Sequence, residues 1–183
     1  MGDSLTNQGN VMPVRSLRDR QVLDPMNDAS SFTAFNTDTA NVADSNNNIL
    51  GNGSISFDKA NTAANSLIAG IDKTIAKEVL TEYLGSDLIS AAVFLSTLVD
   101  VASVSIRLGT DASNYSQWNV ADTDLVAGWN QLSLPLSSKA SQTGTGHDMA
   151  NITYAAVLVT FDVETDVLTG ILWDHLNIQS ANN

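Results

Sequence analysis

The 183-residue chain has no cysteine and only two histidines. Without cysteine it can form no disulfide, thiolate nucleophile or cysteine-based zinc site. Neither His147 nor His175 is accompanied by a Gly-x-Ser-x-Gly motif, so no Ser-His-Asp hydrolase is indicated. Only three glutamates accompany the abundant aspartates, and no phosphate-binding glycine motif opens a helix. We therefore predict a protein that is not an enzyme and has no catalytic residue.

Positive charge and long apolar runs are also scarce. Lys and Arg number 8 against 20 Asp and Glu, a net charge of −12. Because nucleic-acid binding requires a cationic surface, we expect no nucleic-acid partner. Nothing approaches 18 continuous apolar residues, so we expect no membrane span. The N-terminus lacks the basic region and apolar run of a signal peptide, which favours synthesis in the cytoplasm.

Residues 1–27 show no sustained apolar periodicity, and Pro13 and Pro25 interrupt any helix. We expect an extended N-terminal arm here. It could bind a partner through apolar anchors and guanidinium groups, or it could be a tail without a role. The candidate partner-binding residues are Val14, Arg15, Leu17, Arg18 and Arg20.

From Gly53 onward, short segments alternate apolar and polar residues and are separated by turn residues. This pattern is typical of an antiparallel β-sandwich or jelly roll, which we predict over 28–179, followed by a C-terminal tail at 180–183. Residues 75–84 are the one segment with helical spacing. The expected strands are 54–57, 66–74, 88–95, 102–108, 114–120, 131–136, 152–163 and 168–178. The expected core contains Ile55, Phe57, Val104, Ile106, Leu132, Leu134 and Leu158.

Calcium is the ion that best suits a domain rich in aspartate, because hard cations bind carboxylates and carbonyls. The segment 44–48 begins like an EF-hand loop, but Ile49 stands where that loop requires glycine. Asp58 and Asp174 could instead converge on a structural calcium. The competing interpretation is that such aspartates form turns with their own backbone.

The larger aromatic residues allow two interpretations. Tyr115, Trp118, Trp129 and Trp173 could stack on sugar rings, or they could fill the core. Trp129, between Gly128 and Asn130, suggests a structural corner. Tyr115 and Trp118 are the candidates for glycan binding.

Three segments resemble carbohydrate-binding-module-like (galactose-binding-like) jelly rolls. They are Val104–Tyr115 with Trp118 and the Gly-Trp-Asn turn at 128–130, the closing strand Ile171–Ile178, and Phe32–Phe35 with 53–57. The resemblance covers about 28–179. His175 stands where the closing strand of that group has a second Asp, and Phe35 stands where a Trp is common.

The resemblance implies either of two roles, because such domains occur both as modules of glycan-active enzymes and in tailed-phage virions. We expect a non-catalytic capsid decoration protein of a tailed-phage virion. It would dock on capsid or other virion proteins through its arm and would form a homo-oligomer. The alternative is a stand-alone carbohydrate-binding module that recognises a polysaccharide.

Overall fold

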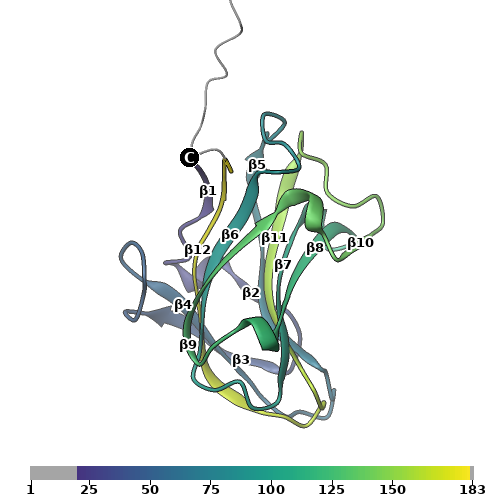
Figure 1. Cartoon of the computed structure of the whole chain (residues 1–183). Coiled ribbons are helices and arrows are strands. Elements are labelled where there is room, and N and C mark those ends of the chain that lie inside the picture. The colour runs from purple at the N-terminus through teal and green to yellow at the C-terminus, as the bar shows by residue number, and fades with distance from the viewer. Residues whose placement is uncertain (1–19, 182–183) are drawn as a thin grey trace, which may run out of the picture.

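Residues 20–181 are described by a computed structural model, in which two antiparallel sheets pack face to face (Figure 1). The predicted all-β sandwich is confirmed. Each sheet contains six strands of the described chain. The described chain also contains three short 3₁₀ turns: η1 (Ala29–Ser31), η2 (Asp122–Asp124) and η3 (Leu136–Ser138). Within this region, no helix has the length and apolar character needed to cross a membrane.

Most successive strands belong to different sheets, here called sheet A and sheet B, so that most connections cross from one layer to the other. Sheet A has the order β3 (Thr39–Ser45), β4 (Ser54–Lys59), β12 (Leu168–Gln179), β6 (Leu88–Leu95) and β9 (Gly128–Pro135), with β1 (Arg20–Asp24) also paired to β12. Sheet B has the order β10 (Ser141–Thr143), β8 (Asn114–Ala121), β7 (Val101–Asp111), β11 (Ile152–Phe161), β5 (Ile68–Glu78) and β2 (Thr33–Ala34).

The core lies between the sheets, because alternate residues of each strand point inward. Five of the seven expected core residues are buried there: Ile55, Phe57, Val104, Ile106 and Leu132. The other two need correction. Leu134 is only partly buried against this core. Leu158 is buried but belongs to a separate cluster on the opposite face of sheet B.

The predicted helical segment at 75–84 is wrong. Strand β5 continues through Glu78, and Ile75 is buried as one of its inward residues. The spacing that suggested a helix arises where this strand ends and turns follow. Strands β1, β3 and β10 were not predicted, because their sequences are mostly polar and show no sustained alternation of apolar residues.

The boundaries of the sandwich are wider than predicted. Strand β1 pairs with β12, Leu23 and Met26 enter the core, and Asp24 forms an ion pair of 2.5 Å with Lys73. The end of the predicted arm therefore belongs to the domain, including Arg20, which lies opposite Gln179 in this pairing. The partner-binding predictions for Val14, Arg15, Leu17 and Arg18 fall outside the described residues.

The start of the predicted C-terminal tail is also attached to the domain. The backbone N–H of Ala181 donates a hydrogen bond of 3.1 Å to the carboxylate of Asp87. Ser180 is buried beside the same carboxylate. The described sandwich therefore runs from residue 20 to residue 181.

Candidate functional site

A second cluster of apolar side chains lies on sheet B, on the face turned away from the core. Val157 and Val159 of β11 point into the core, so Tyr154, Ala156 and Leu158 point outward by alternation. All three are nevertheless buried, because side chains from neighbouring segments cover them. We call this surface the B face, made of Phe35, Ile68, Asp72, Arg107, Tyr115, Gln117, Tyr154, Ala156 and Leu158.

Small residues let the rings of the B face lie close to the sheet. Gly109 lies opposite Tyr115 in the pairing of β7 with β8, and a Cβ at Gly109 would approach the Tyr115 Cβ to 2.8 Å. Ala156 lies between Arg107 and Asp72 in one row across the sheet.

Arg107 occupies the middle of the B face and is only 9% exposed. Its guanidinium carbon lies 4.4 Å from the ring centre of Tyr115 and 5.0 Å from that of Phe35. Such contacts between a cation and aromatic rings are attractive. The guanidinium group thus contacts two half-buried rings from different parts of the chain.

A chain of amide groups orients Arg107. Its Nε donates a hydrogen bond of 2.6 Å to the side-chain oxygen of Gln117. The Gln117 amide nitrogen in turn donates to Asn119 at 2.8 Å and to Ser105 at 3.4 Å. This arrangement turns the oxygen of Gln117 toward Arg107 and restricts the guanidinium to one orientation.

Tyr154 and Asp72 form the other half of the B face. The Tyr154 hydroxyl donates a hydrogen bond of 3.3 Å to Asp72, and its ring centre lies 6.3 Å from that of Tyr115. Burial raises the pKa of Tyr154 well above its ordinary value, and the charge of Asp72 adds to this effect. Burial also raises the pKa of Asp72, against the lowering effect of this hydrogen bond. The phenol therefore stays protonated and remains a donor.

A cleft of about 490 Å³ adjoins this pair. Its volume lies within the usual range for small-ligand sites. Most of the side chains around it carry hydroxyl or carboxyl groups, which suit a ligand that both donates and accepts hydrogen bonds. The lining residues are Ser31, Thr33, Asp72, Lys73, Thr74, Thr110, Asp111, Ala112 and Tyr154.

The two predicted glycan-binding residues are separated by the fold. Tyr115 lies on the B face, half-buried. Trp118 is fully buried in the core, where its ring nitrogen donates to the carbonyls of Pro135 and Leu136, each at 3.2 Å. It therefore has no exposed ring surface for a ligand, and the glycan-binding interpretation of Trp118 is corrected to a structural one.

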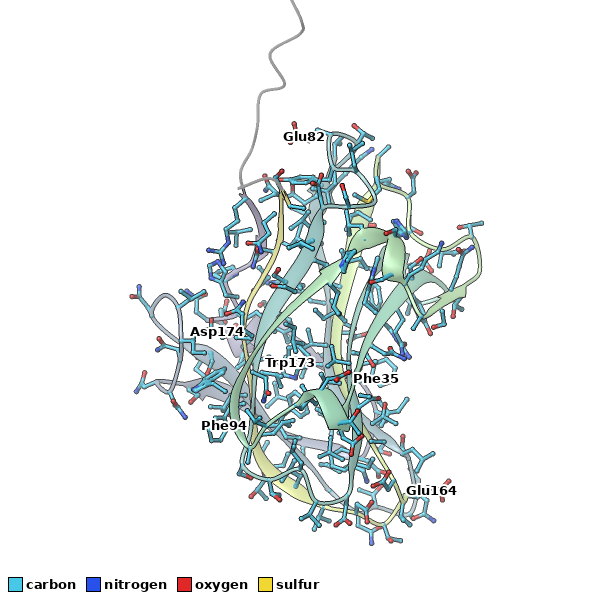
Figure 2. All side chains as sticks on the ribbon, viewed as in Figure 1. Phe35, Glu82, Phe94, Glu164, Trp173 and Asp174 are labelled. Carbon is cyan, nitrogen blue, oxygen red and sulfur yellow. The ribbon has the colours of Figure 1, made fainter. Side chains whose placement is uncertain are left out.

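The other two tryptophans also have distinct places. Trp173 is fully buried inside the sandwich (Figure 2). Trp129 is half-buried on the outer side of sheet A, where its ring meets Phe94 edge to face at 5.6 Å. The sequence-based interpretation of Trp129 as a corner is compatible with its place at the start of β9, beside Gly128 with its positive φ of 106°.

Neither histidine lies in an arrangement that supports hydrolysis. The Nδ1 of His147 lies 2.7 Å from the Ser116 hydroxyl, but Ser116 is fully buried and cannot reach a substrate. Burial lowers the pKa of His147, which favours the neutral ring. His175 lies in an irregular part of β12 with a positive φ of 57°, and burial lowers its pKa as well.

The two aspartates predicted to bind calcium do not converge. Asp58 lies within β4 and accepts hydrogen bonds from Gly170 N of β12 at 2.7 Å and from Asn41 Nδ2 of β3 at 2.6 Å, so its partners are on neighbouring strands and not in a turn of its own backbone. Asp174 accepts from Ile49 N at 2.9 Å and Leu50 N at 2.8 Å, in the loop between β3 and β4 (Figure 2). No group of three or more His, Asp or Glu in residues 20–181 could hold a metal ion. A calcium site shared by both aspartates is therefore not formed.

Of the two aspartates, only Asp174 has a buried carboxylate oxygen that a cation could neutralise. Its carboxylate is fully buried, and Oδ1 has no hydrogen-bond partner among the described residues. A buried carboxylate oxygen without a donor is costly. Calcium bound at Asp174 stays a prediction.

Sequence reasoning missed Phe35, Asp72, Arg107 and Tyr154 as candidate binding residues. One signal was available for Arg107, because the alternation of 102–108 places it outward with Ser103 and Ser105. The sequence also contained a signal that Tyr115 and Trp118 do not form one binding surface. They are three residues apart, which puts them on opposite faces of one strand.

No protein-family model matches the chain, and no curated protein matches its sequence. Solved structures do share its fold. A family 11 carbohydrate-binding module from Clostridium thermocellum, in complex with a β-1,3-1,4-mixed-linked tetrasaccharide, aligns with a TM-score of 0.62 and 9% identity. The alignment covers 88% of this chain and 96% of that module.

Two further structures align along most of this chain. A family 30 carbohydrate-binding module of a cellulosomal cellulase from Clostridium thermocellum has a TM-score of 0.51 and 9% identity, with 78% of this chain and 83% of that module covered. An exo-β-agarase has a TM-score of 0.57 and 9% identity, over 90% of this chain but 26% of the enzyme. The chain therefore has the β-sandwich fold of carbohydrate-binding modules.

Proposed function

We propose that this protein is a non-catalytic carbohydrate-binding module that binds a polysaccharide on the B face. The observation that carries the proposal is the grouping of Tyr115, Arg107, Tyr154 and Asp72 beside a cleft lined by hydroxyl groups. Ring faces can pack on the apolar side of a pyranose, while the polar groups bind its hydroxyls.

The fold adds support to this proposal. A module with the same fold was solved with a tetrasaccharide, and it aligns over nearly its whole length. The similarity to an exo-β-agarase covers only a quarter of that enzyme, which fits an accessory module better than a whole catalytic protein. The glycan-binding alternative drawn from the sequence therefore has more support than the role in a phage virion, which none of these comparisons favours.

The test is binding of the full chain to a panel of soluble polysaccharides, followed by titration calorimetry with oligosaccharides of the best binder. We expect Tyr115→Ala to weaken binding about two- to tenfold, which corresponds to the 0.5–1.5 kcal/mol typical of an aromatic contact. Trp129→Ala is the matched control, because it removes another half-buried ring from the opposite sheet.

Two results would contradict the proposal. One is the absence of binding to every neutral and acidic polysaccharide tested. The other is an equal loss of affinity in Tyr115→Ala and Trp129→Ala with unchanged melting temperatures, because the B face would then have no particular part in binding.

A further inference from the structure

Lys59 and Arg107 are the two buried cations of the described residues, and of these two only Arg107 forms no ion pair with a carboxylate. The ion pairs of the described residues join Lys59 to Asp38 and Lys73 to Asp24, and neither includes Arg107. The chain has twelve more acids than cations, so a shortage of carboxylates does not explain this. A charged group that is nine-tenths buried is stable only when other groups compensate its charge.

The Arg107 donors without a hydrogen bond to a described residue are the two terminal nitrogens of its guanidinium group, Nη1 and Nη2. Nε is bound to Gln117, and no hydrogen bond joins Nη1 or Nη2 to any described residue. Neither nitrogen is among the buried polar atoms that lack a partner, so both reach the surface of the B face. The rings of Tyr115 and Phe35 contact the guanidinium group, and the two Nη nitrogens remain for a ligand.

We propose that the glycan bound on the B face is a polyuronide and that Arg107 selects it by pairing with a ring carboxylate. This inference rests on the proposed function. A guanidinium fork matches the geometry of a carboxylate with two parallel hydrogen bonds. The amide chain through Gln117 holds the fork in place before the ligand arrives, so little conformational entropy is lost on binding.

The overall negative charge of the protein does not prevent this binding. Several acids lie in the connections between strands: Asp122 and Asp124 are in η2, and Glu164 is in the loop between β11 and β12, at the end of the sandwich opposite Glu82 (Figure 2). At physiological salt the screening length is about 8 Å, so exposed charges farther away contribute little. Asp72 on the B face lies two strands from Arg107 with Ala156 between them, and Asp111 lines the adjoining cleft. Both charges oppose a ligand carboxylate and should limit the affinity.

A pair of ligands that differ only in the carboxylate tests the proposal. The affinity of the full chain for tetragalacturonate would be measured by titration calorimetry beside that for its methyl ester, with oligomers of alginate and glucuronoxylan as other uronides. We expect at least one uronide to bind, at least about 30-fold more tightly than its neutral ester, the low end for a desolvated charge pair. Its affinity should fall as salt is raised.

Three variants assign the effect to residues. Arg107→Gln should lower the affinity for the acid to about that for the ester and change the affinity for the ester little. Asp72→Asn should strengthen binding of the acid, and it keeps the proposal testable if Arg107→Gln fails to fold. Lys77→Gln removes one positive charge from an exposed position of β5 and should change neither affinity.

The outcomes separate this inference from the proposed function. Tight binding of neutral β-glucans without binding of any uronide would overturn the role of Arg107 and leave the proposed function standing. Equal losses for acid and ester in Arg107→Gln would also overturn it, as would binding of a sulfated galactan but of no uronide. Failure to bind any glycan would overturn both.

Discussion

Breaking the buried pair of Lys59 and Asp38 should be among the most destabilising single changes in this fold. Both side chains are fully buried, and Lys59 Nζ lies 3.3 Å from Asp38. The ammonium group also donates to the carbonyls of Ala60 at 2.8 Å and Glu164 at 3.0 Å. It thereby joins the end of β4 to the loop before β12.

Replacing Lys59 with Met should destabilise the protein by about 3–5 kcal/mol, because Asp38 then stays buried without its counter-ion. With an m-value of roughly 2 kcal/mol/M in urea, the unfolding midpoint should fall by about 1.5–2.5 M. Fluorescence reports the transition, since Trp118 and Trp173 are fully buried in the folded state.

Lys77→Met is the matched control, because Lys77 is exposed on β5 and the same substitution there should change stability by less than about 0.5 kcal/mol. A midpoint shift below about 0.5 M in Lys59→Met would refute the reasoning. It would mean that the hydrogen bonds from Thr62 and Ser66 stabilise the Asp38 carboxylate without any help from Lys59.

Further predictions concern acid stability, packing, calcium and the N-terminal arm. The hydroxyl of Thr62 is the main cause that holds the pKa of Asp38 below its ordinary value of 3.8. The resulting stability should be present above about pH 4 and lost as pH falls through the lower folded pKa, so that Asp38→Asn flattens this part of a plot of melting temperature against pH. Gly109→Ala should cost about 1–3 kcal/mol in urea unfolding and weaken glycan binding, because its methyl group would collide with β8. Millimolar calcium should raise the melting temperature relative to chelator in the natural protein but not in Asp174→Asn, and a temperature that calcium leaves unchanged would remove this prediction. Deleting residues 1–19 should leave glycan affinity in titration calorimetry unchanged, because the residues of the B face all lie within residues 20–181. A loss of affinity in the shortened chain would show that the proposed site is incomplete without these residues.

Much of the sandwich is readable from local sequence. Alternation predicted that Val104 and Ile106 point inward and that Arg107 points outward, and the structure confirms all three. Residues 88–95 form a strand with the predicted bounds. These features depend on a repeat of two residues along one strand, which a short stretch of sequence contains in full.

Strand β11 marks the limit of this reasoning. Its sequence, from Ile152 to Phe161, is apolar almost without interruption, so no alternation distinguishes its two faces. Leu158 was assigned to the core for that reason, whereas it lies on the B face beneath Phe35 and Ile68. Both faces of this strand are covered, and only its neighbours decide which side faces the other sheet.

The sequence by itself determined the all-β class, the strands with clear alternation and the outward position of Arg107. The tertiary structure decided the candidate site, because its residues come from separate strands that pairing brings together. Asp72 and Arg107 belong to one row only because β5 and β7 both pair with β11. Such pairings depend on the packing of the whole sandwich, since no local pattern states which strand will lie beside which.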